Sequence, residues 1–243
     1  LGKDKKFVES HQNPGDFVLE DPKGINIKFN TPEGPMANGY LLKGEEEDEW
    51  VFVFHEWYGL NDYIRRESER LFEELDGEVN ILAIDLYDGN VASNREEASE
   101  LMQAMKEARA HDIISGAVNL AGNDAEIATL GWCFGGAWAL QAGIELGDQS
   151  EAVVMYYGMP EKDIDRLKQL EAPVLGIFGS QDNNINPDVV EEFEEAMQEA
   201  GKKLKVEMYD AGHAFANPSN QVFDEEATED AWKKAVSFLK EHL

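Results

Sequence analysis

Residues 127–142, IATLGWCFGGAWALQA, predict the fold of this chain. The apolar run before Gly131 is typical of a buried strand, and the alanine-rich run after Gly136 is typical of a helix. Between them lies Gly-x-Cys-x-Gly, with Cys133, the only cysteine, at its centre. In the serine form of this element, a sharp turn lifts the nucleophile above the carboxyl edge of a parallel sheet. We expect Cys133 to be a nucleophile; the alternative is an inert buried thiol, since free cysteine is often buried.

The chain also supplies a base and an acid downstream of Cys133. A buried strand runs into Asp182, and a further strand runs into His213 within a Gly-His turn. The order nucleophile, acid, histidine is that of the α/β-hydrolase arrangement, in which each member follows a strand. We therefore predict a triad of Cys133, Asp182 and His213. Asp182 has the alternative role of a plain turn residue, and Asp210 is the fallback acid.

An acyl-transfer site needs two donors for the developing oxyanion, of which one is the backbone N–H after the nucleophile. Phe134 provides that N–H, and Trp57, which follows the predicted strand 50–54, is the natural second donor. We expect Glu56 to lie close to the thiol, where a carboxylate can influence ionisation or move a proton. The alternative for Glu56 is a salt bridge in a loop. His55 fits a structural role better, because a triad needs only one base.

Strand and helix patterns alternate along most of the chain, which predicts a mainly parallel sheet with helices on both faces. The alternating segments 25–29 and 37–42 predict an antiparallel hairpin near the N-terminus. We expect one α/β-hydrolase domain over residues 1–243, since the length and 42% apolar content suffice for one core. The ranges with helical periodicity are 63–75, 95–121, 189–200 and 228–239.

Five segments together resemble the dienelactone hydrolase family, a cysteine branch of the α/β hydrolases. They are spread over about residues 25–240, and they are His55-Glu56-Trp57-Tyr58-Gly59, Asp85-Leu86-Tyr87, Gly131-Trp132-Cys133-Phe134-Gly135-Gly136, Gly179-Ser180-Gln181-Asp182 and Gly212-His213-Ala214-Phe215. The resemblance implies the same triad, with Glu56 interacting with the resting thiol until substrate displaces it. It also implies hydrolysis of an enol-lactone such as 4-carboxymethylenebut-2-en-4-olide to maleylacetate, without a cofactor.

The chain departs from the family at the places that hold an anionic substrate. Members that cleave dienelactone use one arginine just after the Asp-Leu-Tyr segment and one four residues after the catalytic histidine. Here those places read Asp88-Gly89 and Asn217. Arg95 could replace one of them, or it could form a surface ion pair. We therefore favour a lactone or short ester hydrolase whose small-molecule substrate is uncharged.

Three aromatic residues adjoin the predicted catalytic loops, and we expect Tyr58, Tyr87 and Phe215 to line the substrate pocket. No metal is expected, because the chain has no His-x-x-x-His motif and no other histidine and carboxylate cluster with ligand spacing. The alternative function is a redox-responsive or binding protein on the same scaffold, with Cys133 as an oxidisable thiol. The absence of a second, resolving cysteine disfavours this alternative.

The chain is strongly acidic. It has 50 acidic and 21 basic residues, for a formal charge of −29, against a magnitude of about 2 to 8 for an ordinary small domain. Such a charge disfavours nucleic acid and anionic membranes as partners, since phosphate contacts rely on Lys and Arg. We expect a monomer or small homo-oligomer in the cytoplasm, because a single cysteine is compatible with a reducing compartment. The sequence starts without Met, so we expect a processed or trimmed N-terminus.

The acidic residues form runs, such as 45–49, 191–195 and 224–226, that are typical of solvated surfaces. Their repulsion is screened at high ionic strength, where the Debye length falls to about 3 Å at 1 M. We therefore predict adaptation to high salt. The melting temperature should rise between dilute buffer and molar KCl in a thermal unfolding series; a melting temperature that stays level would contradict the prediction.

Overall fold

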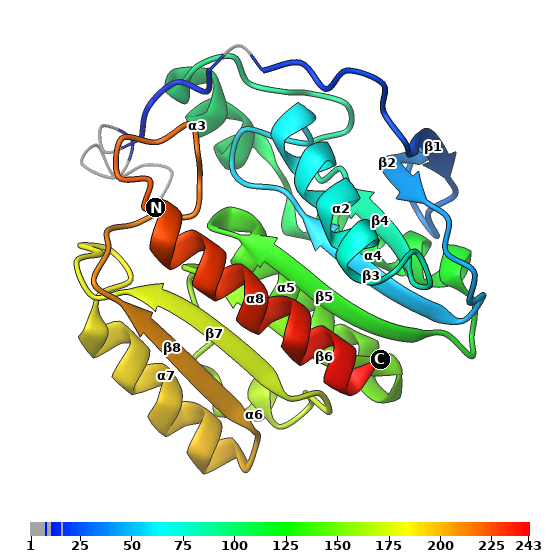
Figure 1. The fold of residues 1–243 in the computed structure, drawn as a ribbon. Helices are drawn as coiled ribbons and strands as arrows, with labels where there is room; N and C mark the ends of the chain where they lie inside the picture. The colour runs from blue at the N-terminus through cyan, green and yellow to red at the C-terminus, as the bar shows by residue number, and fades with distance from the viewer. Residues whose placement is uncertain (1–7, 9–10, 16) are drawn as a thin grey trace. The chain divides into compact units, whose positions relative to one another are not determined.

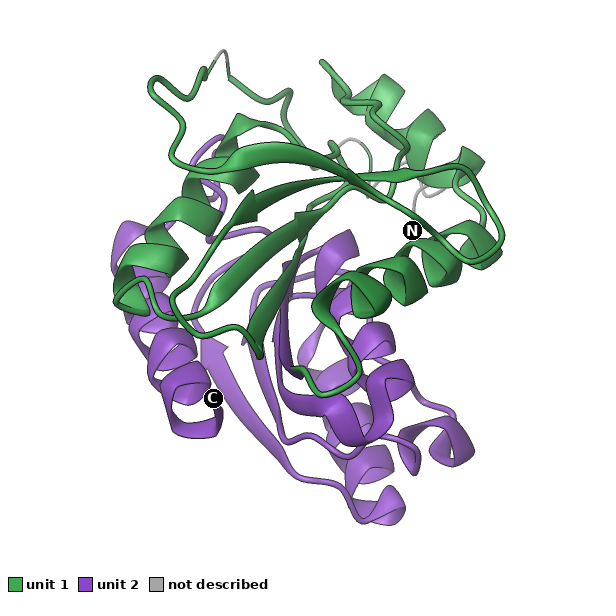
Figure 2. Ribbon diagram, turned by 90° about the vertical axis from the view of Figure 1, so that its right-hand side faces the viewer, with its two compact units in different colours: residues 1–125 green, residues 126–243 purple. Residues whose placement is uncertain are grey.

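The computed structural model describes Val8 and residues 11–15 and 17–243 (Figure 1). The chain divides into two compact units, residues 1–125 and 126–243 (Figure 2). Each unit combines strands with helices, as predicted. The sequence predicted one domain that includes both units, and this stays a prediction. In the described part of the chain, every helix is too short or too polar to cross a membrane.

The first unit contains four strands in the spatial order β1-β2-β4-β3. They are β1 (Ile25–Phe29), β2 (Ala37–Leu42), β3 (Glu49–Phe54) and β4 (Asn80–Ile84). The β1–β2 pair is antiparallel, with Ile25 opposite Leu41, which confirms the predicted hairpin. Strand β2 pairs antiparallel with β4, and β3 pairs parallel with β4. Strands β3 and β4 are buried along almost their whole length, as expected of strands covered on both faces.

Three helices accompany these strands: α2 (Asp62–Glu74), α3 (Arg95–Ala104) and α4 (Glu107–Ala121). Helix α2 packs on β2 and β4, and α4 packs on β1 and β4. The prediction of one helix over residues 95–121 was wrong, because Met105 is extended between α3 and α4. Just beyond this break, Arg109 in the first turn of α4 binds Asp88 and the carbonyl of Pro35. These contacts fix the direction of α4 independently of α3.

The second unit has four parallel strands in the order β5-β6-β7-β8, which confirms the predicted parallel sheet for this part. They are β5 (Glu126–Trp132), β6 (Ser150–Tyr156), β7 (Val174–Gly179) and β8 (Leu204–Tyr209). The helices are α5 (Phe134–Leu146), the short α6 (Ile164–Leu167) and η1 (Gly147–Gln149), α7 (Pro187–Ala200) and α8 (Glu225–His242). The carboxyl ends of parallel strands share one edge of the sheet, so the segments after β5, β7 and β8 meet there.

Helices cover both faces of this parallel sheet. Leu140 of α5 and Phe193 of α7 belong to one buried cluster with Val153 and Met155 of β6. Helix α8 packs on β6 and β7, and Figure 1 shows it in front of these strands, with α5 behind them. Because side chains alternate along a strand, each face of β6 and β7 has its own helical cover.

A buried asparagine fixes the acidic loop of the first unit. The side chain of Asn80 is fully buried at the start of β4. Its Oδ1 accepts the Gly44 N–H at 3.1 Å, and its Nδ2 donates to the carbonyls of Glu46 at 2.7 Å and Glu49 at 3.0 Å. One side chain therefore holds both ends of the run 45–49 against β4.

We predict that Asn80→Ala lowers the free energy of unfolding by about 2–3 kcal/mol, since it removes three hydrogen bonds made by a fully buried amide. Asn123→Ala, in an exposed turn, is the matched control and should change stability by less than about 0.5 kcal/mol. Urea unfolding of both variants measures the difference, and equal effects would show that the loop does not depend on Asn80.

Candidate active site

Cys133 occupies a strained turn between β5 and α5. Its φ is +54°, in the left-handed region, and it is buried. The turn depends on its glycines: a Cβ at Gly131 would collide with the carbonyl oxygen of Gly135, and one at Gly136 would lie 2.7 Å from that of Tyr156. The N–H of Cys133 donates to the same Tyr156 carbonyl at 2.9 Å. The predicted strand-turn-helix element is thus present.

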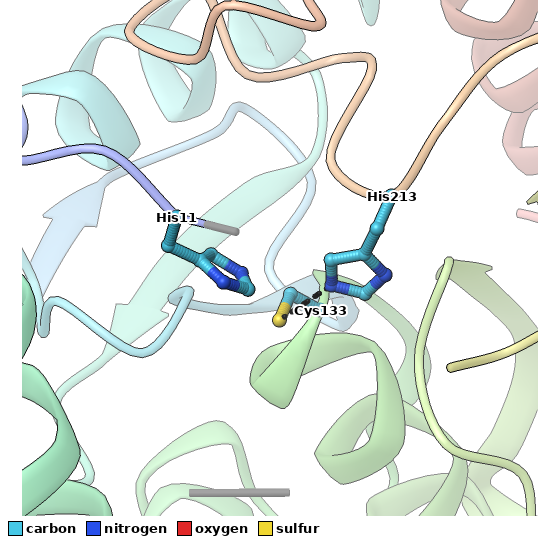
Figure 3. Close-up of side chains that lie close together, drawn as sticks. All are labelled: His11, Cys133 and His213. Carbon is cyan, nitrogen blue, oxygen red and sulfur yellow. Dashed lines mark hydrogen bonds between the residues drawn. The ribbon is translucent and has the colours of Figure 1, made fainter. Parts of the chain in front are cut away.

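His213 lies between Cys133 and Asp182. Its Nε2 is 3.2 Å from Sγ of Cys133, and its Nδ1 is 2.6 Å from Oδ2 of Asp182. Figure 3 shows the imidazole turned toward the sulfur. The other carboxylate oxygen of Asp182 accepts the N–H groups of Asn184 at 2.7 Å and Ile185 at 3.0 Å. Two backbone N–H groups hold the carboxylate in place, and its hydrogen bond with Nδ1 turns Nε2 of the imidazole toward Sγ.

The charges of this group stabilise one another. Burial by itself lowers the pKa of His213, but negative charge on Cys133, the hydrogen bonds to Asp182 and Cys133 and the charge of Asp182 together raise it to about 10. Burial raises the pKa of Asp182, but its bonds to His213 and to two backbone N–H groups outweigh burial and lower it. A protonated imidazole of His213 beside the carboxylate of Asp182 is the form that these contacts favour.

The raised pKa also links protonation to stability. Because the folded pKa of His213 exceeds its ordinary value of 6.5, the linked stabilisation is complete below about pH 6.5. This stabilisation is lost as the pH rises through the pKa of His213 in the folded protein, about 10.

The N-terminus of α5 adds to this electrostatic field. Cys133 is the N-cap and Phe134 the first helical residue. The first N–H groups of a helix have no partner within it, and the positive end of the helix dipole lies there. The N-terminus of α5 is therefore a position of the kind at which proteins bind anions.

Of the two acids predicted from the sequence, the structure places Asp182 on His213. Asp210 is exposed and accepts hydrogen bonds from Gln181 Nε2 at 2.8 Å and Ser180 Oγ at 3.5 Å. Asp210 therefore ties together the loops after β7 and β8.

His55 and Glu56 follow β3 in the first unit. His55 Nδ1 lies 2.6 Å from the Glu56 carbonyl, and Nε2 lies 3.1 Å from the Leu86 nitrogen, so Nδ1 donates and Nε2 accepts. Burial lowers the pKa of His55, and the charge of Asp85 and backbone hydrogen bonds only partly offset this. His55 is thus a neutral residue that ties together the loops after β3 and β4. Glu56 is buried, with 8% of its surface exposed, and its role stays a prediction.

The predicted pocket aromatics are all buried. Phe215 is fully buried and packs on Tyr157. Trp57, the predicted second oxyanion donor, is also fully buried. The hydroxyl of Tyr58 donates to the carbonyl of Gln12. Tyr87 lines a cavity of about 410 Å³ within the first unit. Their contact with substrate, like the oxyanion role of the Trp57 N–H, stays a prediction.

Arginine contacts in the first unit bear on the charge of the substrate. Arg95 is half-buried, and its guanidinium lies 3.1 Å from the exposed carboxylate of Glu96, so it forms the surface ion pair that was the alternative to substrate binding. Arg109, which sequence reasoning missed, lines the same cavity as Tyr87. Its guanidinium binds Asp88 at 2.6 Å and Asp112 at 2.8 Å. Two carboxylates therefore outweigh the one positive charge of Arg109.

Within the second unit, whose residues are all described, no three histidine, cysteine or acidic side chains bring their ligand atoms around one point. The prediction that the site uses no metal stays a prediction. Cys133 and His213 interact directly with each other, and this contact supports nucleophilic chemistry.

The sequence profile of the dienelactone hydrolase family matches residues 38–243. Protein usf of Aquifex pyrophilus is 28% identical over 235 residues, which cover 90% of this chain and 99% of the relative. A protein of Aquifex aeolicus named as a candidate carboxymethylenebutenolidase is 26% identical over 230 residues, with coverages of 90% and 99%.

Solved structures share the fold. A candidate dienelactone hydrolase from Klebsiella pneumoniae has a TM-score of 0.74 at 22% identity and covers 89% of this chain and 98% of its own. A dienelactone hydrolase-like promiscuous phosphotriesterase from metagenomic libraries has a TM-score of 0.75 at 20% identity, with coverages of 90% and 99%. These similarities confirm the predicted α/β-hydrolase fold class.

We predict that Asp182→Asn lowers the pKa of His213, because it removes a negative charge and a hydrogen bond that raise it. Imidazole ¹⁵N shifts followed against pH measure this directly, with His213→Gln to assign the signal among the five histidines. Asp210→Asn removes a neighbouring carboxylate that does not contact His213, and the His213 titration should not move. A shift with Asp210→Asn alone would make Asp210 the orienting acid.

Proposed function

The chain belongs to the dienelactone hydrolase family, and we propose that it cleaves a lactone or short ester through a triad of Cys133, His213 and Asp182. Family membership makes it a carboxylic ester hydrolase in broad class. The observation that carries the finer proposal is the 3.2 Å contact of Sγ with Nε2 in a histidine held by a buried carboxylate. Nucleophile, base and orienting acid in hydrogen-bond reach are what covalent acyl transfer requires.

In the first half-reaction, the Cys133 sulfur attacks the acyl carbon while its proton resides on His213 Nε2. A carbon–sulfur bond forms, and the carbonyl electron pair moves onto oxygen. The Phe134 N–H at the N-terminus of α5 stabilises that oxyanion, with the N–H of Trp57 as the predicted second donor. The oxyanion then collapses, the carbon–oxygen bond breaks, and the leaving alkoxide or enolate takes the proton from His213.

In the second half-reaction, His213 is neutral at Nε2 and accepts a proton from water. The hydroxide attacks the thioester carbon, and a second oxyanion forms at the same donors. Its collapse breaks the carbon–sulfur bond and returns negative charge to Cys133 beside the imidazolium. Because the pKa of His213 is raised to about 10, the imidazole retains this proton at neutral pH.

We propose an uncharged substrate. Asp88 stands where members that cleave dienelactone have an arginine, and it binds Arg109 instead. The chain carries a formal charge of −29, so an anionic substrate is repelled at low salt. The same negative charge makes the chain repel itself, and mobile ions screen this repulsion, which supports the proposed high-salt setting.

We predict that p-nitrophenyl acetate transfers its acetyl group to Cys133. Mass spectrometry of the mixed protein should show one acetyl increment, mapped by proteolysis to the peptide that contains Cys133. Cys133→Ala should abolish both the increment and turnover, and Cys133→Ser separates loss of the thiol from loss of the turn, since serine has the same shape. Acetylation elsewhere, or unchanged turnover in Cys133→Ala, would reject the triad.

A further inference from the structure

Backbone strain in the second unit is concentrated around the proposed triad. All residues of this unit are described, and its non-glycine residues with positive φ are Cys133 (54°), Tyr157 (35°) and Ala214 (62°). Cys133 is the nucleophile, and Ala214 follows His213. Strain of this kind persists where surrounding contacts enforce it, and it gathers at functional sites. Tyr157 is the member of this group that neither belongs to the proposed triad nor adjoins a triad residue in the sequence.

Contacts on both sides of Tyr157 fix its backbone against the nucleophile turn. Its own N–H donates to the Ile177 carbonyl at 2.7 Å. The carbonyl of Tyr156 accepts the Cys133 N–H at 2.9 Å. On the other side, Gly158 approaches α5 so closely that a Cβ there would collide with the backbone nitrogen of Ala137. The position of Tyr157 relative to Cys133 is therefore set by direct backbone contacts.

The side chain of Tyr157 extends from this fixed backbone to the histidine. Its ring packs edge-to-face on His213, with centroids 5.3 Å apart and an interplanar angle of 62°. Phe215 packs on the same ring at 5.5 Å and 67°. Tyr157 is 1% exposed, so its ring is enclosed by neighbouring groups. One residue thus connects the nucleophile turn with the imidazole.

We propose that the ring of Tyr157 is a positioning residue that holds the His213 imidazole in the plane in which Nε2 meets Sγ of Cys133. The proposal rests on the proposed function of that pair. The hydrogen bond from Nδ1 to Asp182 fixes one end of the imidazole, but the ring can still rotate about the line of that hydrogen bond. A ring packed against the imidazole blocks that rotation, and misplacement by about 1 Å can cost about 100-fold in rate.

The experiment compares Tyr157→Leu, which removes the ring, with Tyr157→Phe, which keeps it. Phe193→Leu is the matched control: it removes a fully buried aromatic ring of α7 in the same unit, from the cluster that contains Val153 and Met155. The readouts are the His213 imidazole titration and the rate at which iodoacetamide alkylates Cys133 at neutral pH. Neither readout needs an ester substrate, so wild-type protein that fails to form an acyl-enzyme would reject the proposed function without affecting this comparison.

We expect Tyr157→Leu to lower the pKa of His213 by about one unit, and the alkylation rate by about tenfold, because a displaced imidazole no longer stabilises the thiolate. Tyr157→Phe should stay within about threefold of wild type. Phe193→Leu should lower the melting temperature without a change in the His213 titration. Normal titration and alkylation in folded Tyr157→Leu would overturn the proposal, as would a tenfold loss in Tyr157→Phe. If Tyr157→Leu does not fold, Tyr157→Met is measured in its place.

Discussion

The close contact between Gly131 and the carbonyl of Gly135 is the constraint on which the site depends. Because no side chain separates β5 from α5, the chain reverses within a few residues and places Cys133 in a left-handed conformation. The same reversal puts the sulfur at the N-terminus of α5. From there Sγ contacts the imidazole of His213, which lies 80 residues later in the sequence. Larger residues at these positions would move Cys133 away from His213.

The sequence predicted the triad because each member carries a local signal. Cys133, Asp182 and His213 each follow a buried strand, and in a parallel sheet the carboxyl ends of the strands meet at one edge. The choice between Asp182 and Asp210 needed the structure, since both are turn residues beside a strand end. The hairpin and the parallel strands of the second unit were predictable for the same reason: their alternating or continuous apolar patterns are local.

Features that depend on contacts between distant segments were not predictable. Residues 95–121 have continuous helical periodicity, which predicts one helix, whereas the structure has a break at Met105. Just after the break, Arg109 binds Asp88, which lies 21 positions earlier in the sequence, and periodicity does not report such a contact. Tyr157 directly follows β6, and its proposed role depends on a backbone conformation and a ring contact that no sequence pattern specifies. Helix α6 has only four residues, too few for periodicity to show.

The left-handed backbone of Cys133 also limits which amino acids can serve as nucleophile at this position. A β-branched residue with φ near +54° brings a second γ substituent against its own backbone, which makes such a conformation a genuine outlier. Threonine has a hydroxyl competent for acyl transfer elsewhere, but it fits this turn poorly. Exchange between thiol and hydroxyl chemistry during divergence of the fold is therefore restricted to the unbranched pair, cysteine and serine.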